Sequence, residues 1–125
     1  FFRNIYNDSV NYIKNDRNKY TSYNVVDKSS IVVGFQSTLT FEAFGMGRKV
    51  LVIDFTDSND YNDYEPIILL KKPSYSELEN RLNELLAEPY EDYHKRTKEY
   101  ASYVMNYDPS RPPHKIIREI INQFM

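Results

Sequence analysis

The chain has 125 residues, enough for one small domain, and its hydrophobic share of 41% and charged share of 27% are typical of a globular protein. Its 16 basic and 18 acidic residues give a net charge of −2, without the clustered basic surface that nucleic-acid binding requires. The absence of cysteine excludes disulfides and thiolate zinc sites, and no apolar run approaches the roughly 20 residues that span a bilayer. We therefore expect a cytoplasmic protein with no membrane span and no nucleic-acid partner.

In chain order, the sequence opens with a polar segment. Within residues 1–23, only a few apolar side chains have a helix-like spacing, and these are Phe2, Ile5, Val10 and Ile13. Asn24 has the residue type of a helix cap, so we expect it to begin a short helical turn through Asp27.

Two apolar runs then flank a helical pattern. Residues 30–35 and 49–54 are rich in β-branched side chains and lack polar alternation, so each predicts a strand buried on both faces. Between them, residues 39–46 have helical spacing, and Gly47 provides a stop signal. With a third strand over residues 66–70, the pattern predicts one α/β domain over residues 1–125, with a Rossmann-like parallel sheet flanked by helices.

Helices are predicted after the sheet. One opens at Ser74 or Ser76, ends near Pro89 and has a leucine face made of Leu78, Leu82, Leu85 and Leu86. A second runs from about Tyr90 to Met105. We expect the last helix to pack back on the domain through its apolar residues, which are Ile116, Ile117, Ile120, Ile121 and Phe124.

The most informative segment follows the first strand, which ends at Gly34. In open α/β sheets, ligands bind beyond the carboxyl ends of the strands. The next helix directs its free amides and its positive dipole end to the same place, which favours an anion. Ser37 and Thr38 add hydroxyl donors there. Glu42, just over one turn into the helix, is placed to accept hydrogen bonds from a ribose diol.

These residues resemble the donor-site segment of GT-B glycosyltransferases, above all bacterial enzymes of capsule- and lipopolysaccharide-type surface-carbohydrate biosynthesis. The shared pattern, over about residues 27–54, is a strand followed by Ser37, Thr38 and Glu42 and then by a glycine, a basic residue and a second strand. The resemblance implies that Ser37 and Thr38 contact the donor diphosphate, that Glu42 contacts the ribose, and that Gln36 borders the sugar or the acceptor. A glycine-rich loop is missing at this turn.

The chain begins with two phenylalanines rather than methionine, so we expect a fragment, and the resemblance implies that it is the C-terminal, donor-binding half of a GT-B architecture. The resemblance implies an N-terminal domain of the same polypeptide, with the acceptor site and usually the catalytic base. We assign no catalytic residue, expect no metal and no cofactor, and expect no turnover from these residues alone, because half of the cleft is missing. The expected partner is a nucleotide-sugar donor. An apolar patch left exposed on the last helix would lead the isolated chain to self-associate.

Other functions fit parts of the sequence. UDP-sugar 2-epimerases share the spacing from serine to glutamate, but they prefer glycines where this chain has Thr38 and Leu39. A small non-enzymatic interaction or receiver-like domain would use Asp54 at a strand end with Lys71 or Lys72 after it, although the paired N-terminal acids are missing. Ser37 and Thr38 would otherwise be a plain helix cap, with Glu42 as a solvated residue.

The acidic segment 54–65 invites a metal interpretation. It fails the calcium-loop pattern, because the sixth position from Asp57 is not glycine and the twelfth is Ile68. We expect a solvated loop at the cleft rim, where Tyr61 and Tyr64 are candidates to cover a ligand.

Overall fold

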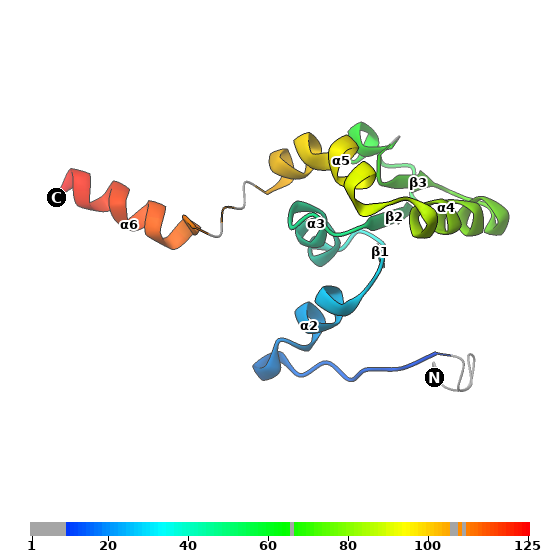
Figure 1. The fold of residues 1–125 in the computed structure, drawn as a ribbon, viewed down its shortest axis with the longest axis horizontal. Helices are drawn as coiled ribbons and strands as arrows, with labels where there is room; N and C mark the ends of the chain where they lie inside the picture. Colours follow the sequence, from blue (N-terminus) through cyan, green and yellow to red (C-terminus); the bar gives the residue numbers. More distant parts are fainter. Residues whose placement is uncertain (1–9, 66, 106–107, 109) are drawn as a thin grey trace.

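A parallel three-stranded sheet lies at the centre of the fold (Figure 1). The computed structural model describes residues 10–65, 67–105, 108 and 110–125. The strands follow one another across the sheet as β1 (Val32–Gly34), β2 (Val50–Asp54) and β3 (Leu69–Lys71), and both pairings are parallel. The predicted α/β fold with a parallel sheet is confirmed.

Helices precede, connect and follow the strands. In chain order they are η2 (Arg17–Lys19), α2 (Thr21–Lys28), α3 (Thr38–Gly45), η3 (Asn62–Tyr64), α4 (Tyr75–Ala87), α5 (Tyr90–Val104) and α6 (Pro113–Phe124). Helix α3 connects β1 to β2, which completes the predicted strand–helix–strand unit. Among the helices that the structure describes, each is too short or too polar to cross a membrane.

Strand β2 is the buried centre of this sheet. Val50, Leu51 and Val52 are each at most 1% exposed. Successive side chains of a strand point to opposite faces, and the packing follows this rule. Val50 and Val52 belong to a core cluster with residues of α3 and α5, whereas Leu51 packs with Leu85 of α4 and Tyr93 of α5. The sheet is therefore covered on both faces around β2, as the sequence predicts for that strand.

The outer strands differ from the sequence prediction. The predicted burial of residues 30–35 on both faces is wrong, because β1 spans only Val32–Gly34 and its Val33 is 46% exposed. β1 pairs with β2 alone among the described strands, so it is an edge strand. β3 begins only at Leu69, and Ile67 and Ile68 lie buried in the turn that leads into it. An apolar run indicates burial, but it does not show which residues join the hydrogen-bonded ladder.

Helix α2 also begins earlier than predicted. Asn24 lies inside this helix rather than at its cap, and its side-chain amide donates a hydrogen bond to the carbonyl oxygen of Lys19, at 2.9 Å. Val10 and Ile13 lie in extended or bent chain, so their helix-like spacing does not mark a helix. Phe2 and Ile5 fall outside the described residues.

Helix α4 buries less of its leucine face than the sequence predicts. Leu85 is buried and Leu78 and Leu82 pack against the same cluster, but Leu86 is 60% exposed. Leu86 follows Leu85 by about 100° around the helix, which turns its side chain away from the sheet.

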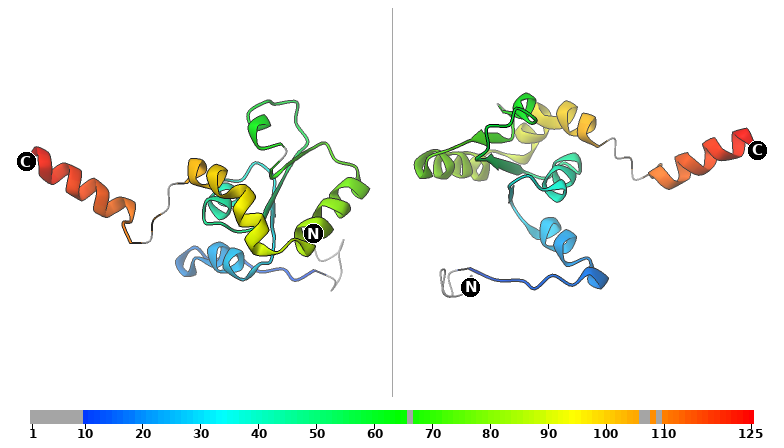
Figure 2. Two further views of the ribbon diagram at one scale, coloured as in Figure 1. Left: turned by 45° about the horizontal axis from the view of Figure 1, so that its top comes forward. Right: turned by 180° about the vertical axis from the view of Figure 1, so that it is seen from behind.

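Helix α6 stands apart from the rest of the fold in every view (Figures 1 and 2). None of its residues is buried. The prediction that its apolar residues pack back on the domain is therefore wrong. Its isoleucines follow helical spacing, but an apolar stripe indicates that a helix can be covered and does not say by what.

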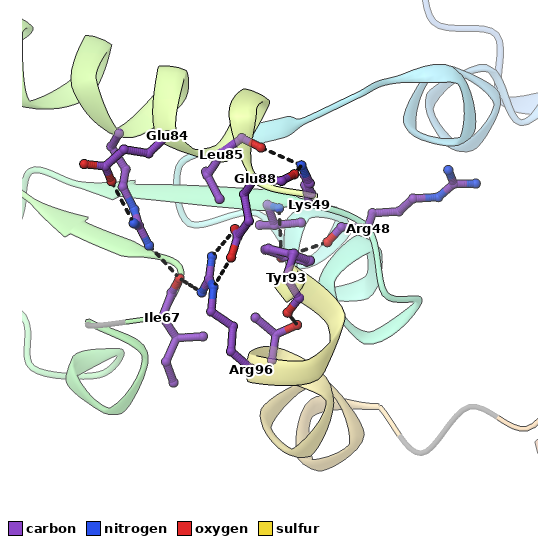
Figure 3. A network of polar contacts seen from close by, with 11 residues as sticks. Arg48, Lys49, Ile67, Glu84, Leu85, Glu88, Tyr93 and Arg96 are labelled. Atoms are coloured by element: carbon purple, nitrogen blue, oxygen red, sulfur yellow. Dashed lines mark hydrogen bonds and ion pairs between the residues drawn. The ribbon is translucent and has the colours of Figure 1, made fainter. Parts of the chain in front are cut away.

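A polar network ties α5 to the amino end of β2 (Figure 3). The buried Tyr93 hydroxyl accepts a hydrogen bond from the Val50 amide, at 3.1 Å, and donates one to the carbonyl oxygen of Arg48, at 3.0 Å. These are backbone groups at the point where the strand begins, so the tyrosine satisfies a donor and an acceptor that burial would otherwise leave without partners.

Charged side chains surround this tyrosine. The Arg96 guanidinium forms a two-pronged ion pair with Glu88, at 2.6 and 2.7 Å, and lies over the Tyr93 ring, 5.0 Å from its centroid. Lys49 donates hydrogen bonds to the carbonyl oxygens of Leu85, at 2.6 Å, and Glu88. Figure 3 shows that the network joins the end of α4 and the start of α5 to the sheet. These polar groups therefore hold α4 and α5 against the sheet at the edge where the strands begin.

Candidate functional site

The carboxyl ends of the three strands share the opposite edge of the sheet. Parallel pairing places Gly34 beside Val52 and Asp54 beside Lys71, so the chain leaves all three strands at one edge. The four predicted substrate-binding residues, Gln36, Ser37, Thr38 and Glu42, all follow β1 at this edge.

The turn from β1 into α3 has an unusual backbone. Gln36 is exposed and adopts the left-handed conformation, with φ of 43°, which is uncommon for a residue other than glycine. Ser37 is the N-cap residue of α3, but its side chain makes no capping hydrogen bond. Thr38, the first helical residue, is exposed. The plain-cap interpretation of Ser37 therefore lacks its defining bond, and its hydroxyl lies beside helix amides that have no helical acceptors.

Gly34 makes this turn tight. A Cβ atom at Gly34 would lie 1.9 Å from Oγ1 of Thr40, a buried residue in the first turn of α3. A side chain at position 34 would therefore push α3 away from β1. Glycine lets the helix begin directly at the strand end.

Glu42 lies one turn after Thr38, on the same side of α3. It is half-buried, and its Oε2 accepts a hydrogen bond from the hydroxyl of Tyr23 in α2, at 2.6 Å. This hydrogen bond from Tyr23 to Glu42 raises the pKa of the tyrosine above its ordinary value. Glu42 is thus held by α2 rather than being freely solvated.

A cavity of about 360 Å³ lies beside the same part of α3. Leu39, which follows Thr38, forms part of its wall, and Val25 and Val26 of α2 contribute apolar surface. Asn11 and Asn15 add amide groups from the extended chain that precedes η2. The cavity therefore combines apolar walls with a few hydrogen-bonding groups, as small-molecule sites commonly do.

Asp54 closes the central strand at the same edge. It is 1% exposed, and its Oδ1 accepts hydrogen bonds from the hydroxyl of Thr56, at 2.7 Å, and from the Thr56 amide, at 2.8 Å. These bonds lower the pKa of Asp54. Its Oδ2 has no hydrogen-bond partner among the described residues.

The receiver-like interpretation gains little from this environment. The Lys71 ammonium donates a hydrogen bond to the carbonyl oxygen of Ser58, at 2.8 Å, and Lys72 pairs with Asp57. Neither lysine forms an ion pair with Asp54, whose carboxylate is buried. A phosphoacceptor aspartate needs to be reached from solvent, so this arrangement does not favour that function.

The acidic loop after β2 packs against α3 through its tyrosines. Tyr61 and Tyr64, the candidates to cover a ligand, are half-buried instead against Phe41 of α3, with ring centroids 5.1 and 5.7 Å from the phenylalanine ring. In the described part of the chain, no three carboxylates or histidines gather in a way that could hold a metal ion.

Sequence reasoning missed two residues at this edge. Tyr23 was not assigned because the predicted helix began after it, and no spacing in the sequence connects it with a glutamate 19 positions later. For Asp54, the sequence suggests a phosphoacceptor or a member of an acidic loop, and neither interpretation predicts its burial. Its place at the end of a buried strand was the available signal for a buried carboxylate.

Comparison with known proteins connects the chain to a biological process. No curated protein and no solved structure matches the chain. Residues 1–118 match a family described as "putative O-antigen biosynthesis protein", so the match includes the sheet, the start of α3 and Glu42. With nearly its whole length matched, this chain belongs to that O-antigen biosynthesis family.

Proposed function

We propose that this chain is the nucleotide-sugar donor-binding part of a glycosyltransferase of surface-polysaccharide biosynthesis. The start of α3 carries the proposal. Ser37, which makes no capping hydrogen bond, and the exposed Thr38 lie beside free helix amides at the carboxyl edge, and Glu42 follows one turn later. Membership of an O-antigen biosynthesis family agrees with a surface carbohydrate as the product.

In this proposal the diphosphate of the donor binds at the start of α3. The helix amides and the positive end of the helix dipole favour an anion there, and hydrogen bonds to an anion are stronger than those to a neutral group. Ser37 and Thr38 donate hydroxyl hydrogen bonds to the phosphate oxygens. Gln36, exposed at the turn, borders the sugar.

The nucleoside would extend along α3 from the diphosphate. Glu42 accepts hydrogen bonds from the ribose diol. The cavity beside Leu39 would receive the base, since its volume of about 360 Å³ lies within the usual range for small ligands. Its apolar walls suit the flat faces of a base, and Asn11 and Asn15 offer groups for the base edges.

This arrangement also suits the chemistry of sugar transfer. When the bond between the anomeric carbon and the phosphate oxygen breaks, the nucleoside diphosphate leaves with an added negative charge. The amides at the start of α3 would stabilise that charge, and this kind of preorganised stabilisation is often the largest contribution to catalysis. The group that activates the acceptor lies outside the residues assigned here.

Isothermal titration calorimetry tests the proposal directly. We expect at least one of the ribonucleotides UDP, GDP, CDP and ADP to bind the wild-type protein. Replacement of Glu42 by alanine should weaken that binding by about 1–3 kcal/mol, the range for a hydrogen bond that involves a charged group.

The matched control is Glu79→Ala, which removes an exposed carboxylate from α4. It should leave the affinity unchanged, and both variants should keep the thermal stability of the wild type within a few degrees. Equal affinities of wild type and Glu42→Ala, or no binding of any of the four nucleotides, would contradict the proposal.

A further inference from the structure

The bond between Tyr23 and Glu42 joins two different helices at the proposed ribose position. Tyr23 reaches from α2 to α3 across 19 residues of sequence, and its 2.6 Å hydrogen bond occupies Oε2 of Glu42. Oε1 has no hydrogen-bond partner among the described residues. The tyrosine thus fixes one carboxylate oxygen and leaves the other to a ligand.

Helix α2 has other attachments to the fold. Val26 is buried in the same core cluster as Ala43 and Phe44 of α3, and Asp27 forms an ion pair with Arg48. These contacts attach the C-terminal half of α2 to the domain without Tyr23. The tyrosine is also 43% exposed, so its hydroxyl bond is not needed to fill the core.

Fixing a glutamate has a consequence for binding. A free glutamate side chain loses rotational entropy when a ligand orders it, and this loss lowers the affinity. A carboxylate that already holds one strong hydrogen bond pays less of this cost, because its rotamer is chosen before the ligand arrives. The remaining oxygen can then accept from a ribose hydroxyl in one preferred direction.

We propose that Tyr23 is a positioning residue that orients the Glu42 carboxylate toward the ribose and so makes the site prefer ribonucleotides over 2′-deoxyribonucleotides. This inference rests on the proposed function, because it requires Glu42 to contact the ribose. It assigns to α2 a part in donor selection that neither the sequence pattern nor the family description indicates.

The test measures the affinities of the pairs UDP and dUDP, GDP and dGDP, CDP and dCDP, and ADP and dADP by calorimetry. Wild type should bind the ribonucleotide of a pair more tightly. Tyr23→Phe keeps the ring and removes only the hydroxyl, so it should reduce this preference by about two- to tenfold, the effect of one hydrogen bond. The deoxynucleotide, which keeps only the 3′-hydroxyl, should lose less affinity than the ribonucleotide, and the melting temperature should stay unchanged.

Controls separate the two proposals. Tyr75→Phe removes a hydroxyl from an exposed tyrosine at the start of α4 and should leave the preference unchanged. Glu42→Ala should abolish the preference. If Glu42→Ala abolishes it and Tyr23→Phe leaves it intact, the role of Tyr23 is wrong while the proposed function stands. If Glu42→Ala also leaves it intact, the ribose contact itself is wrong. An equal loss for both nucleotides in Tyr23→Phe, together with a lower melting temperature, would reduce Tyr23 to a structural contact.

Discussion

At the scale of single residues, Tyr93 shows how one buried hydroxyl supports the sheet. Burial raises the pKa of Tyr93 to about 12, above its ordinary value of 10.0. The folded protein therefore holds this proton more tightly than the unfolded chain does. The resulting stability is complete below pH 10 and is lost as the pH rises from 10 to 12. We expect the free energy of unfolding to fall by about 2 kcal/mol more in wild type than in Tyr93→Phe across that window. Denaturant unfolding at several pH values measures this difference.

Tyr100→Phe is the matched control on the same helix, because Tyr100 is exposed and its ring lies outside the core clusters. Its unfolding free energy should depend on pH as the wild type does. Near pH 7, Tyr93→Phe should cost about 1–3 kcal/mol, since it leaves the buried Val50 amide without its partner. Parallel pH curves for wild type and Tyr93→Phe would contradict the assignment.

Some residues of the candidate site can be placed from the sequence alone, and others cannot. Ser37, Thr38 and Glu42 follow one another within one helix, so the turn signal and the helical spacing place them without a structure. Tyr23 and Glu42 meet through the packing of two helices, and the sequence carries no signal for that contact. The same holds for Tyr93 and Val50, which lie 43 positions apart.

At the scale of elements, the start of α4 is defined by a reciprocal cap. The Ser74 hydroxyl accepts a hydrogen bond from the Glu77 amide, at 3.3 Å, and the Ser74 amide donates to Oε2 of Glu77, at 2.7 Å. The sequence allows either Ser74 or Ser76 to begin this helix, and the structure selects Ser74. We expect Ser74→Ala to lower the free energy of unfolding by about 0.5–2 kcal/mol, because it removes the cap.

Ser76→Ala tests whether the cap is specific. Ser76 lies within the first turn and makes no capping bond, so its replacement by a better helix former should change stability by less than about 0.5 kcal/mol. Chemical denaturation of both variants gives the comparison. Equal losses for the two serines would show that the helix begins at a different residue.

The same local signals explain why elements were predicted better than their packing. Cap, stop signal and apolar spacing predict α3, α4 and α5 to within one or two residues. The exposure of β1 could not be predicted, because the order of strands in a sheet is set by contacts between distant segments. β2 is central and β1 lies at the edge although both have β-branched runs.

At the scale of the whole molecule, α6 differs from every other described α-helix. The sheet, α2 to α5 and the turn before β3 contribute all of the buried hydrophobic residues in the described chain, and α6 contributes none. The apolar side of α6 is exposed at Ile117, Ile120, Ile121 and Phe124. The stability of the α/β body, which consists of the sheet and α2 to α5, should therefore not depend on the apolar side of α6.

This separation leads to a prediction for the double variant Ile117→Glu and Ile121→Glu. Its melting temperature should match that of the wild type, because neither isoleucine packs in the core clusters. An exposed apolar stripe of this kind favours association, so light scattering should show a mass that grows with concentration for the wild type and a constant monomer mass for the variant. Lys95→Gln and Lys98→Gln on the exposed side of α5 give the same change of charge without altering an apolar surface, and this control should associate as the wild type does. A large fall in the melting temperature of the isoleucine variant would instead mean that α6 packs on the body through these side chains in solution.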